Sequence, residues 1–432
     1  MLEMCAAAVS QFENREDISP MSLKDFIRPF LPDRAVTFVK ERKQDLIRLR
    51  CYLTPQRSYR PGKYPPGVNL TGYIQAEMGL GQSCRCLAQA LEAGNVPFSV
   101  ISYQHGAPAK MGDCSWDSKM NGVRYNVNLT VINADQLYSA VPRLGADYWN
   151  GHYQIAHYAW ELPEYPAEWV RVSRRFDEIW TPSTFCTQAV AAAVDRPVYT
   201  IPYVIEPKLS QPRSREHFGL PEDRFLFLCM FDVNSVIQRK NPMAAISAFL
   251  KAFPEDDPRV GLVVKVNDAQ GNPEVQSYLK ELIREHSNIY LINQVLSRND
   301  VNALICVCDC FVSMHRSEGF GLVMAEAMYF GKPVIATNWS SNTDFMNEEN
   351  SCPVRCQLVP VDQDYVVYKK GQIWADPDVD HCAQYMAALV EDPEYRRRIA
   401  AAGQASIRRQ YSAESAAKAI KERLDQIAQI KK

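Results

Sequence analysis

Long apolar runs are missing from this chain of 432 residues, because none approaches the 18 residues that a membrane-spanning helix needs. No basic region precedes the short alanine-rich run in residues 1–10, so we expect no signal peptide. The 13 cysteines are scattered and lack the spacing of a small disulfide framework. These absences together predict reduced cysteines and a cytoplasmic protein.

Excess charge of either sign is missing too. The chain has 48 Lys and Arg residues against 50 Asp and Glu residues, which gives a formal net charge of −2. Bulk charge therefore gives no reason to expect nucleic-acid binding. Cysteines gather at 306–310 and at 352–356, but no His at a suitable spacing supports a zinc site. We expect these cysteines to be small buried side chains.

What the chain does have is an alternation of short apolar runs with helical stretches. The first set of expected strands lies at 68–74, 98–102, 126–132, 154–159, 178–182 and 198–204, and the second at 225–231, 260–266, 288–293, 310–314 and 333–337. This alternation predicts an α/β fold with two doubly wound, mostly parallel sheets. In such sheets the carboxyl ends of the strands form the ligand-binding edge.

The expected parts of the chain are a helical N-terminal extension and linker at 1–66, a first α/β domain at 67–207, a second at 208–410, and a C-terminal helix at 411–432. The extension should hold two helices, at 22–30 and 34–53. The second of these mixes basic and apolar residues. We favour a helix packed on the core, and the alternative is a basic amphipathic helix that lies on an anionic membrane.

The most informative stretch covers residues 315–326. An apolar run precedes it and a helical pattern follows it, so the stretch is a strand, a tight glycine turn and a helix start. Gly319 and Gly321 let backbone N–H groups approach a ligand closely, and a helix N-terminus favours an anion such as a phosphate. Glu318 lies in the turn. Glu326 lies on the helix, five residues past Gly321 and so about 8 Å further along at about 1.5 Å per residue.

Glu318 and Glu326, with seven residues between them that begin Gly-Phe-Gly-Leu, resemble the E-x7-E signature of retaining glycosyltransferases of the GT-B fold, in particular family 4, the glycosyl transferases group 1. The resemblance implies two Rossmann-like domains that face a cleft, an N-terminal acceptor domain and a C-terminal donor domain. It implies that Glu318 contacts the transferred sugar and that Glu326 binds the ribose hydroxyls. The further donor-binding residues that it implies are Gly319, Phe320, Gly321 and Leu322.

A second glycine turn precedes the helix expected from about residue 82. Gly79 and Gly81 can cradle an anion there, but Cys84 stands where a dinucleotide fingerprint needs its third glycine. The turn resembles the first loop of family 4 enzymes, which sits under the donor phosphates. Gly79 and Gly81 are therefore donor-binding candidates, and the alternative is a simple strand-to-helix turn.

Basic residues stand at the ends of two expected strands. Arg239, Lys265 and Glu318 come from three separate strand ends, which converge on one crevice in an open parallel sheet. The resemblance implies that Arg239 and Lys265 clamp the donor diphosphate, a role that suits two cations. Lys240 should point to solvent.

His157 lies near the end of a strand in the first domain. The resemblance implies a His there, near the sugar and with a catalytic role, and a core His is the alternative. Trp160 and Glu161 are weaker candidates for the acceptor site on the same grounds.

The resemblance implies a retaining glycosyltransferase that moves a hexose from GDP-mannose or a UDP-hexose to a glycan or lipid-linked acceptor. The nucleotide sugar is a donor substrate, so we expect no cofactor. The Asp-x-Asp pairs at 362–364 and 376–378 fall in expected loops away from the motif, so we expect no essential metal. Peripheral contact with the inner face of the membrane belongs to the same interpretation.

Other classes of protein fit less well. A glycoside hydrolase needs two carboxylates that face each other across a bond, and an oxidoreductase needs a fuller glycine fingerprint. The main alternative is a non-catalytic GT-B protein that binds nucleotide sugars or acts as a scaffold. Such a protein would normally have lost one of the residues Arg239, Lys265, Glu318 or Glu326, and this chain keeps all four.

Overall fold

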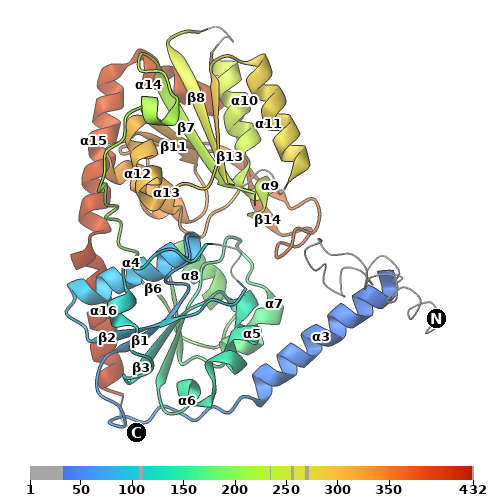
Figure 1. The fold of residues 1–432 in the computed structure, drawn as a ribbon, viewed down its shortest axis with the longest axis vertical. Helices are drawn as coiled ribbons and strands as arrows, with labels where there is room; N and C mark the ends of the chain where they lie inside the picture. Colours follow the sequence, from blue (N-terminus) through green and yellow to red (C-terminus); the bar gives the residue numbers. More distant parts are fainter. Residues whose placement is uncertain (1–32, 107–109, 234, 254–256, 268–271, 431–432) are drawn as a thin grey trace, which may run out of the picture.

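The computed structural model describes residues 33–106, 110–233, 235–253, 257–267 and 272–430. The helix expected at 22–30 lies outside these residues. Two α/β bodies stand one above the other, and a long helix, α3 (Asp33–Leu53), projects from the lower one (Figure 1). Among the described residues, no helix combines the length and the apolar character that crossing a membrane requires.

The lower body contains a six-stranded parallel sheet with the strand order β2-β1-β3-β4-β5-β6. Its strands are β1 (Val68–Gly72), β2 (Phe98–Ser102), β3 (Val127–Val131), β4 (Tyr153–His157), β5 (Glu178–Thr181) and β6 (Val198–Thr200). Its helices are α4 (Gly79–Ala93), α5 (Ala134–Leu144), α6 (Ala146–Trp149), α7 (Ala167–Ser173) and α8 (Thr184–Ala191). Strand β6 is shorter than expected, because Pro202 has no N–H group for the ladder.

The upper body contains a second six-stranded parallel sheet with the order β12-β11-β10-β7-β8-β9. Its strands are β7 (Phe225–Asp232), β8 (Val260–Asn267), β9 (Ile289–Asn293), β10 (Cys310–Ser313), β11 (Val334–Thr337) and β12 (Cys352–Val354). Its helices are α9 (Ile237–Lys240), α10 (Pro242–Ala252), α11 (Pro273–Glu285), α12 (Arg298–Val307), α13 (Leu322–Tyr329) and α14 (Val379–Glu391). The prediction of an α/β fold with two doubly wound parallel sheets is confirmed.

Two further features join the bodies. Helices α15 (Pro393–Gln410) and α16 (Ala413–Ala428) run down the side of both bodies, and α16 packs on α4 of the lower one (Figure 1). An antiparallel hairpin, β13 (Cys356–Pro360) with β14 (Ile373–Pro377), leaves the upper body. This hairpin lies where the sequence pattern predicts loops, so that prediction is wrong. The domain limits given above stay predictions.

The described cysteines are free thiols, and most of them are buried. In the two clusters, Cys308, Cys310 and Cys352 are almost fully covered, whereas Cys306 and Cys356 are partly exposed. The neighbours of the three covered cysteines are core side chains of the upper sheet. These three cysteines therefore serve as small apolar residues in packing.

Candidate active site

The glycine turn after β10 is anchored in the core by Phe320. Its ring centroid lies 5.0 Å from that of Tyr203 and 5.4 Å from that of Phe345. Gly321, at φ 92°, then turns the chain into α13 through the left-handed region that favours glycine. Because the Phe320 side chain points into the core, only its backbone can face a ligand. Leu322 is half-buried and packs on the same core.

Gly319 faces the lower body. A Cβ atom at this position would lie 3.3 Å from the Cβ atom of Ala159. The Gly319 carbonyl accepts a hydrogen bond from the Ser183 hydroxyl at 3.2 Å, and the Thr184 N–H donates to the Asp344 carboxylate at 2.7 Å. The turn therefore lies where the two bodies meet.

Glu318 is held by two cations from α9, and we call these three residues the Glu318 clamp. Its Oε1 lies 3.2 Å from Nη1 of Arg239, and Lys240 Nζ bonds to the same oxygen. Burial alone would raise the pKa of Glu318, but Lys240 and Arg239 lower it to about 2. The carboxylate is therefore ionised at neutral pH. The expectation that Lys240 points to solvent is wrong, because its long side chain reaches the buried carboxylate from a one-turn helix.

Arg239 is buried, with 5% of its surface exposed. Its Nη1 donates to the Ser317 carbonyl at 2.8 Å, while its Nε is buried without a partner. Burial alone would lower the pKa of Arg239, but Tyr368 and Glu318 raise it above its ordinary value. A buried guanidinium with an unused N–H group can donate to a phosphate oxygen.

Lys265 belongs to a second polar cluster. Its Nζ bonds to Asn267, whose Nδ2 donates to the Asp232 carboxylate at 3.2 Å. Burial lowers the pKa of Lys265 to about 8, although Asp232 opposes the shift. Strands β10, β7 and β8 are neighbours in the sheet, so this cluster and the Glu318 clamp stand at adjacent carboxyl ends.

Glu326 on α13 is almost fully buried, and its Oε1 pairs with Nη2 of Arg298 from the first turn of α12. Its other oxygen, Oε2, is buried without a partner. The role of Arg298 was not predicted from the sequence, because no local pattern shows that two residues 28 positions apart are in contact. A fixed carboxylate with one unused oxygen can accept hydrogen bonds from hydroxyl groups.

Gly79 and Gly81 lie in the first turn of α4, not before it. A Cβ atom at Gly81 would lie 2.0 Å from the Ala76 carbonyl oxygen, whereas one at Gly79 would meet nothing within 4 Å. Arg85 holds the preceding loop, because its Nη1 donates to the carbonyls of Ile74 and Ala76 at 2.8 and 3.0 Å. Gly81 is therefore required by packing, and Gly79 has the open space that a ligand would need.

His157 is the last residue of β4 and is 2% exposed. Its ring lies 5.3 Å from that of Tyr203, and its Nε2 is buried without a partner. Burial lowers its pKa to about 3. A histidine that stays neutral inside the core favours the packing interpretation over proton transfer.

The hairpin brings Tyr368 to the Glu318 clamp. The Tyr368 ring lies 5.6 Å from that of Trp160 in the lower body, and the Arg239 guanidinium lies 5.9 Å from its centre. The pKa of Tyr368 is raised by burial, and Glu161, which hydrogen-bonds it, raises it further. Tyr368 thus joins the clamp to Trp160 and Glu161 of the other body, a contact that the sequence analysis missed.

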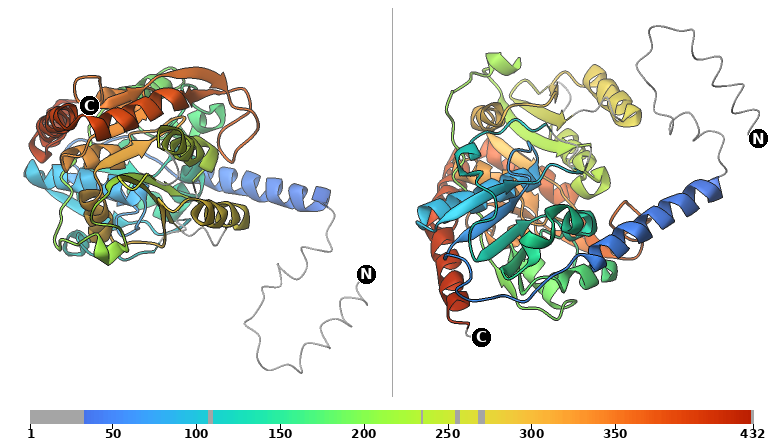
Figure 2. Two further views of the ribbon diagram at one scale, coloured as in Figure 1. Left: turned by 90° about the horizontal axis from the view of Figure 1, so that it is seen from above. Right: turned by 60° about the horizontal axis from the view of Figure 1, so that its bottom comes forward.

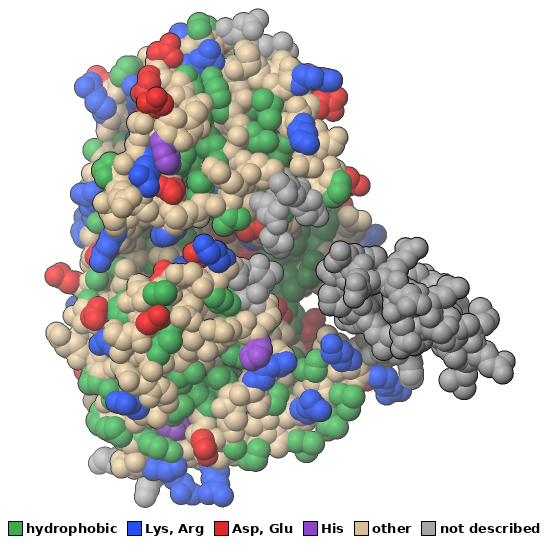
Figure 3. All heavy atoms as spheres, viewed as in Figure 1, with side chains coloured by type: hydrophobic (Ala, Val, Ile, Leu, Met, Phe, Trp, Pro, Cys, Tyr) green, Lys and Arg blue, Asp and Glu red, His purple; other side chains and the backbone are tan. Residues whose placement is uncertain are grey.

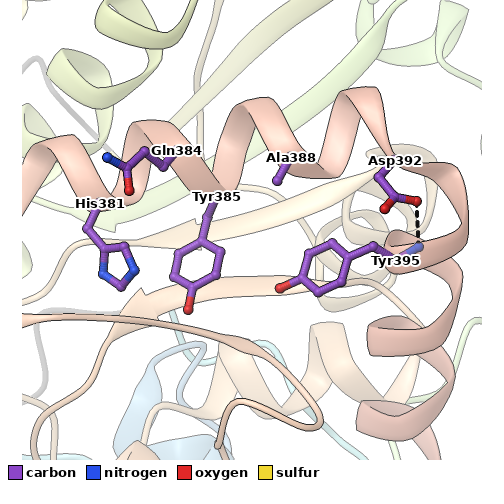
Figure 4. Close-up of a pocket in the computed structure, with 6 residues that line it drawn as sticks. All are labelled: His381, Gln384, Tyr385, Ala388, Asp392 and Tyr395. Carbon is purple, nitrogen blue, oxygen red and sulfur yellow. Dashed lines mark hydrogen bonds between the residues drawn. The ribbon is translucent and has the colours of Figure 1, made fainter.

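A hollow of about 320 Å³ lies away from these strand ends, on α14 and the start of α15. It is lined by His381, Gln384, Tyr385, Ala388, Asp392 and Tyr395 (Figure 4). Its Asp392 accepts from the Tyr395 N–H at 2.9 Å as a helix cap. None of the strand-end residues lines it, so we do not place the site there.

Acidic residues of the two Asp-x-Asp pairs have partners within the protein. Asp364 pairs with Lys369 at 3.2 Å, Asp376 pairs with Arg316 at 2.8 Å, and Asp378 caps α14. Across the described residues, no group of three or more His, Cys, Asp or Glu side chains is placed to hold a metal ion.

Comparisons with known proteins fit this geometry. Residues 210–406 match the family model of the glycosyl transferases group 1. Trehalose synthase of Pyrococcus horikoshii is 28% identical over 167 residues, which are 33% of this chain and 40% of that protein. MMP alpha-(1->4)-mannosyltransferase of Mycolicibacterium hassiacum is 23% identical over 238 residues, 53% of this chain and 49% of that protein. The chain thus spans about half the length, or less, of the curated relatives that it matches.

Solved structures show the same fold. The Anabaena Alr3699/HepE structure in complex with UDP and glucose superposes with a TM-score of 0.57 at 16% identity, over 84% of this chain and 100% of that one. Sucrose-phosphate synthase of Thermosynechococcus elongatus superposes with a TM-score of 0.60 at 16% identity, over 84% of this chain and 99% of that one. The GT-B fold and the resemblance to glycosyl transferases group 1 are confirmed, while family 4 and retention stay predictions.

Proposed function

We propose that this chain is a retaining glycosyltransferase, which moves a hexose from a nucleotide-diphosphate sugar to a glycan or lipid-linked acceptor. The Glu318 clamp is the observation that supports this most. It is an ionised, buried carboxylate that lies beyond the carboxyl end of a parallel strand and pairs with two cations. The family match over residues 210–406 includes the clamp, Lys265 and Glu326.

The donor would lie along the carboxyl ends of the upper sheet. Arg239, through its unused Nε, and Lys265 would bind the diphosphate. The free Oε2 of Glu326 would accept hydrogen bonds from the ribose hydroxyls. Glu318 would hold hydroxyls of the hexose. The backbone of the glycine turn and of α4 near Gly79 would complete the site.

In the transfer, the bond between the hexose C1 and the diphosphate oxygen breaks while C1 bonds to an acceptor oxygen on the same face. The acceptor proton passes to the leaving phosphate. Negative charge grows on the diphosphate, where Arg239 and Lys265 stabilise it. Positive charge grows on the sugar ring, where the ionised Glu318 supports it. These steps need no metal ion, because the protein supplies the cations.

The comparisons suggest the class of donor. The Anabaena neighbour was solved with UDP-glucose, which supports a UDP-hexose. The relative from Mycolicibacterium hassiacum is a mannosyltransferase, which supports a mannose donor such as GDP-mannose. On the lower body, Glu161 acts on Arg239 of the clamp, and Trp160 contacts Tyr368 beside it. Both would lie on the acceptor side.

The donor is tested by thermal unfolding with GDP, UDP, dTDP and their sugars. A ligand at about 100 times its dissociation constant should stabilise the protein by about 2.7 kcal/mol. Nucleotides of one base should stabilise the protein, and they should not stabilise the variants Glu326→Ala and Arg239→Ala. If no nucleotide stabilises the protein, the donor assignment fails.

Transfer and retention need a separate measurement. Incubation of the stabilising sugar nucleotide with candidate glycans, followed by NMR of the product, should show a new glycosidic bond with the anomeric configuration of the donor. An inverted product would overturn retention. Nucleotide binding without consumption of the donor across the acceptor panel would favour the non-catalytic alternative.

A further inference from the structure

Helix α3 has one face that is packed on the lower body. Cys51 is fully buried, and the hydroxyl of Tyr52 donates to that of Tyr138 on α5 at 3.4 Å. The Arg48 guanidinium lies 5.7 Å from the centre of the same Tyr138 ring. Arg175 donates to the Cys51 carbonyl at 3.1 Å. This inner face fixes the direction in which the opposite face points.

The opposite face carries exposed leucines. Leu46, Leu49 and Leu53 are 59%, 51% and 71% exposed. They recur at i, i+3 and i+7, so they form one stripe along the helix. Exposed cations lie on the same face by the same periodicity, at Arg42, Lys43 and Arg50. We call these six residues the outer face of α3.

The outer face stands clear of both bodies. Helix α3 projects from the side of the molecule in all three ribbon views (Figures 1 and 2). Hydrophobic and basic side chains lie next to one another where it leaves the lower body (Figure 3). Residues 42–53 contain four cations and one acid, Asp45, which pairs with Arg42 at 3.8 Å in an exposed contact.

We propose that the outer face of α3 binds the anionic surface of a lipid bilayer. Three large leucines in one stripe are more than the scattered apolar residues of an ordinary surface. At a bilayer the leucines can enter the acyl boundary while the cations meet anionic headgroups, as in other interfacial helices. Pairing with the same face of a second copy is disfavoured, because it would bring like charges together on both sides of the stripe.

Docking through α3 would also place the acceptor side of the molecule at the membrane. Helix α3 is bonded to α5, and α5 begins just after the carboxyl end of β3. That edge of the lower sheet faces the other body. A lipid-linked acceptor could then reach the cleft from the bilayer. This last step rests on the proposed transferase function, whereas the docking itself does not.

The test is flotation of the full chain with vesicles of phosphatidylcholine, with and without phosphatidylglycerol. The protein should float with the anionic vesicles only and dissociate as salt is raised. Leu46→Gln/Leu49→Gln/Leu53→Gln should weaken binding by about a hundredfold, since each leucine contributes about tenfold or less when half-exposed. Arg42→Gln/Lys43→Gln/Arg50→Gln should weaken it by about a hundredfold as well.

A matched control is Val295→Gln/Leu358→Gln, which removes two similarly exposed apolar side chains, 59% and 51% exposed, from the upper body. It should float like the wild type, and all variants should keep the wild-type unfolding temperature. Wild-type protein that stays unbound, or triple variants that float as well as it does, would overturn the proposal. The proposal would also be overturned if light scattering showed that the wild type is a dimer and that the leucine variant is a monomer which floats like the wild type.

Discussion

Two charged side chains at the strand ends of the upper sheet, Glu318 and Lys265, have pKa values that are shifted for different reasons. Glu318 stays ionised because two cations lower its pKa to about 2, while Lys265 is buried and its pKa falls to about 8. The two groups therefore respond to pH in different ranges. Near neutral pH only Lys265 is close to losing its charge, so it should set the pH dependence of donor binding.

Donor affinity should fall as the pH rises through about 8. The protonated form of Lys265 binds the diphosphate, so above its free-state pKa of about 8 binding must take up a proton. The affinity should then drop by up to about tenfold per pH unit. Isothermal titration with the nucleotide that stabilises the protein would measure this. Lys265→Arg, which stays protonated, should bind with little change across the same range, and an unchanged slope in that variant would refute the role of Lys265.

Lys240 and Glu318 should be coupled in stability. Lys240→Met removes one of two partners of a buried carboxylate, and because Lys240 is partly exposed the cost should be about 1 kcal/mol. In a Glu318→Gln background the same substitution removes a charge that has lost its partner, so it should be neutral or stabilising. Urea unfolding of the four proteins gives the coupling energy, expected at about 1 kcal/mol or more. Additive effects would show that the pair is absent in solution.

At the scale of elements, the two glycines at the start of α4 differ in what surrounds them. Gly81 touches the Ala76 carbonyl, and Gly79 faces open space. This difference shows that a glycine-rich turn can combine a packing position with an accessible one. Sequence spacing alone gives both glycines the same ligand-binding role.

Alanine substitutions separate these positions. Gly81→Ala should destabilise the protein by about 2 kcal/mol or more, since its Cβ would overlap the Ala76 carbonyl oxygen. Gly79→Ala should leave stability unchanged or raise it by a few tenths of a kcal/mol, about what helix propensity allows at a helix start. Chemical denaturation would show the contrast. Equal effects at both positions would mean that α4 does not begin as described.

The strands and the glycine motif were predictable because each is encoded locally. Cys310 to Val312 is a continuous apolar run in β10, and Gly321 marks the left-handed position before α13. The hairpin was not predictable. Its strand β13 is mostly exposed and ends at Pro360, a residue that argues against a strand. The partner of Glu326 was not predictable for another reason, since Arg298 lies 28 residues away in sequence and meets Glu326 only through the tertiary fold.

At the scale of the whole molecule, the two bodies are tied together at several distant places. The Ser317 hydroxyl bonds to the Glu161 carbonyl beside the glycine turn. The hairpin places Tyr368 against Trp160. At the far end, α16 returns to the lower body and its Arg423 reaches Glu178. The candidate site lies between these ties, so they determine how the donor and acceptor sides face each other.

Arg423 should be the most costly of these ties to remove. Glu178 is fully buried, and both of its carboxylate oxygens accept from Arg423 at 2.6 to 3.0 Å. Tyr153 and Trp180 donate to the same carboxylate at 2.8 and 2.7 Å. Because Arg423→Met would leave a buried charge without its cation, we expect a loss of about 3 kcal/mol at neutral pH.

The double variant Glu178→Gln/Arg423→Met should recover much of the loss, because no charge is then buried. Urea unfolding of the wild type and the two variants would measure both the loss and its recovery. If Arg423→Met unfolds like the wild type, then α16 does not hold the lower body through this pair, and the relative placement of donor and acceptor sides must rest on the hairpin and the glycine turn.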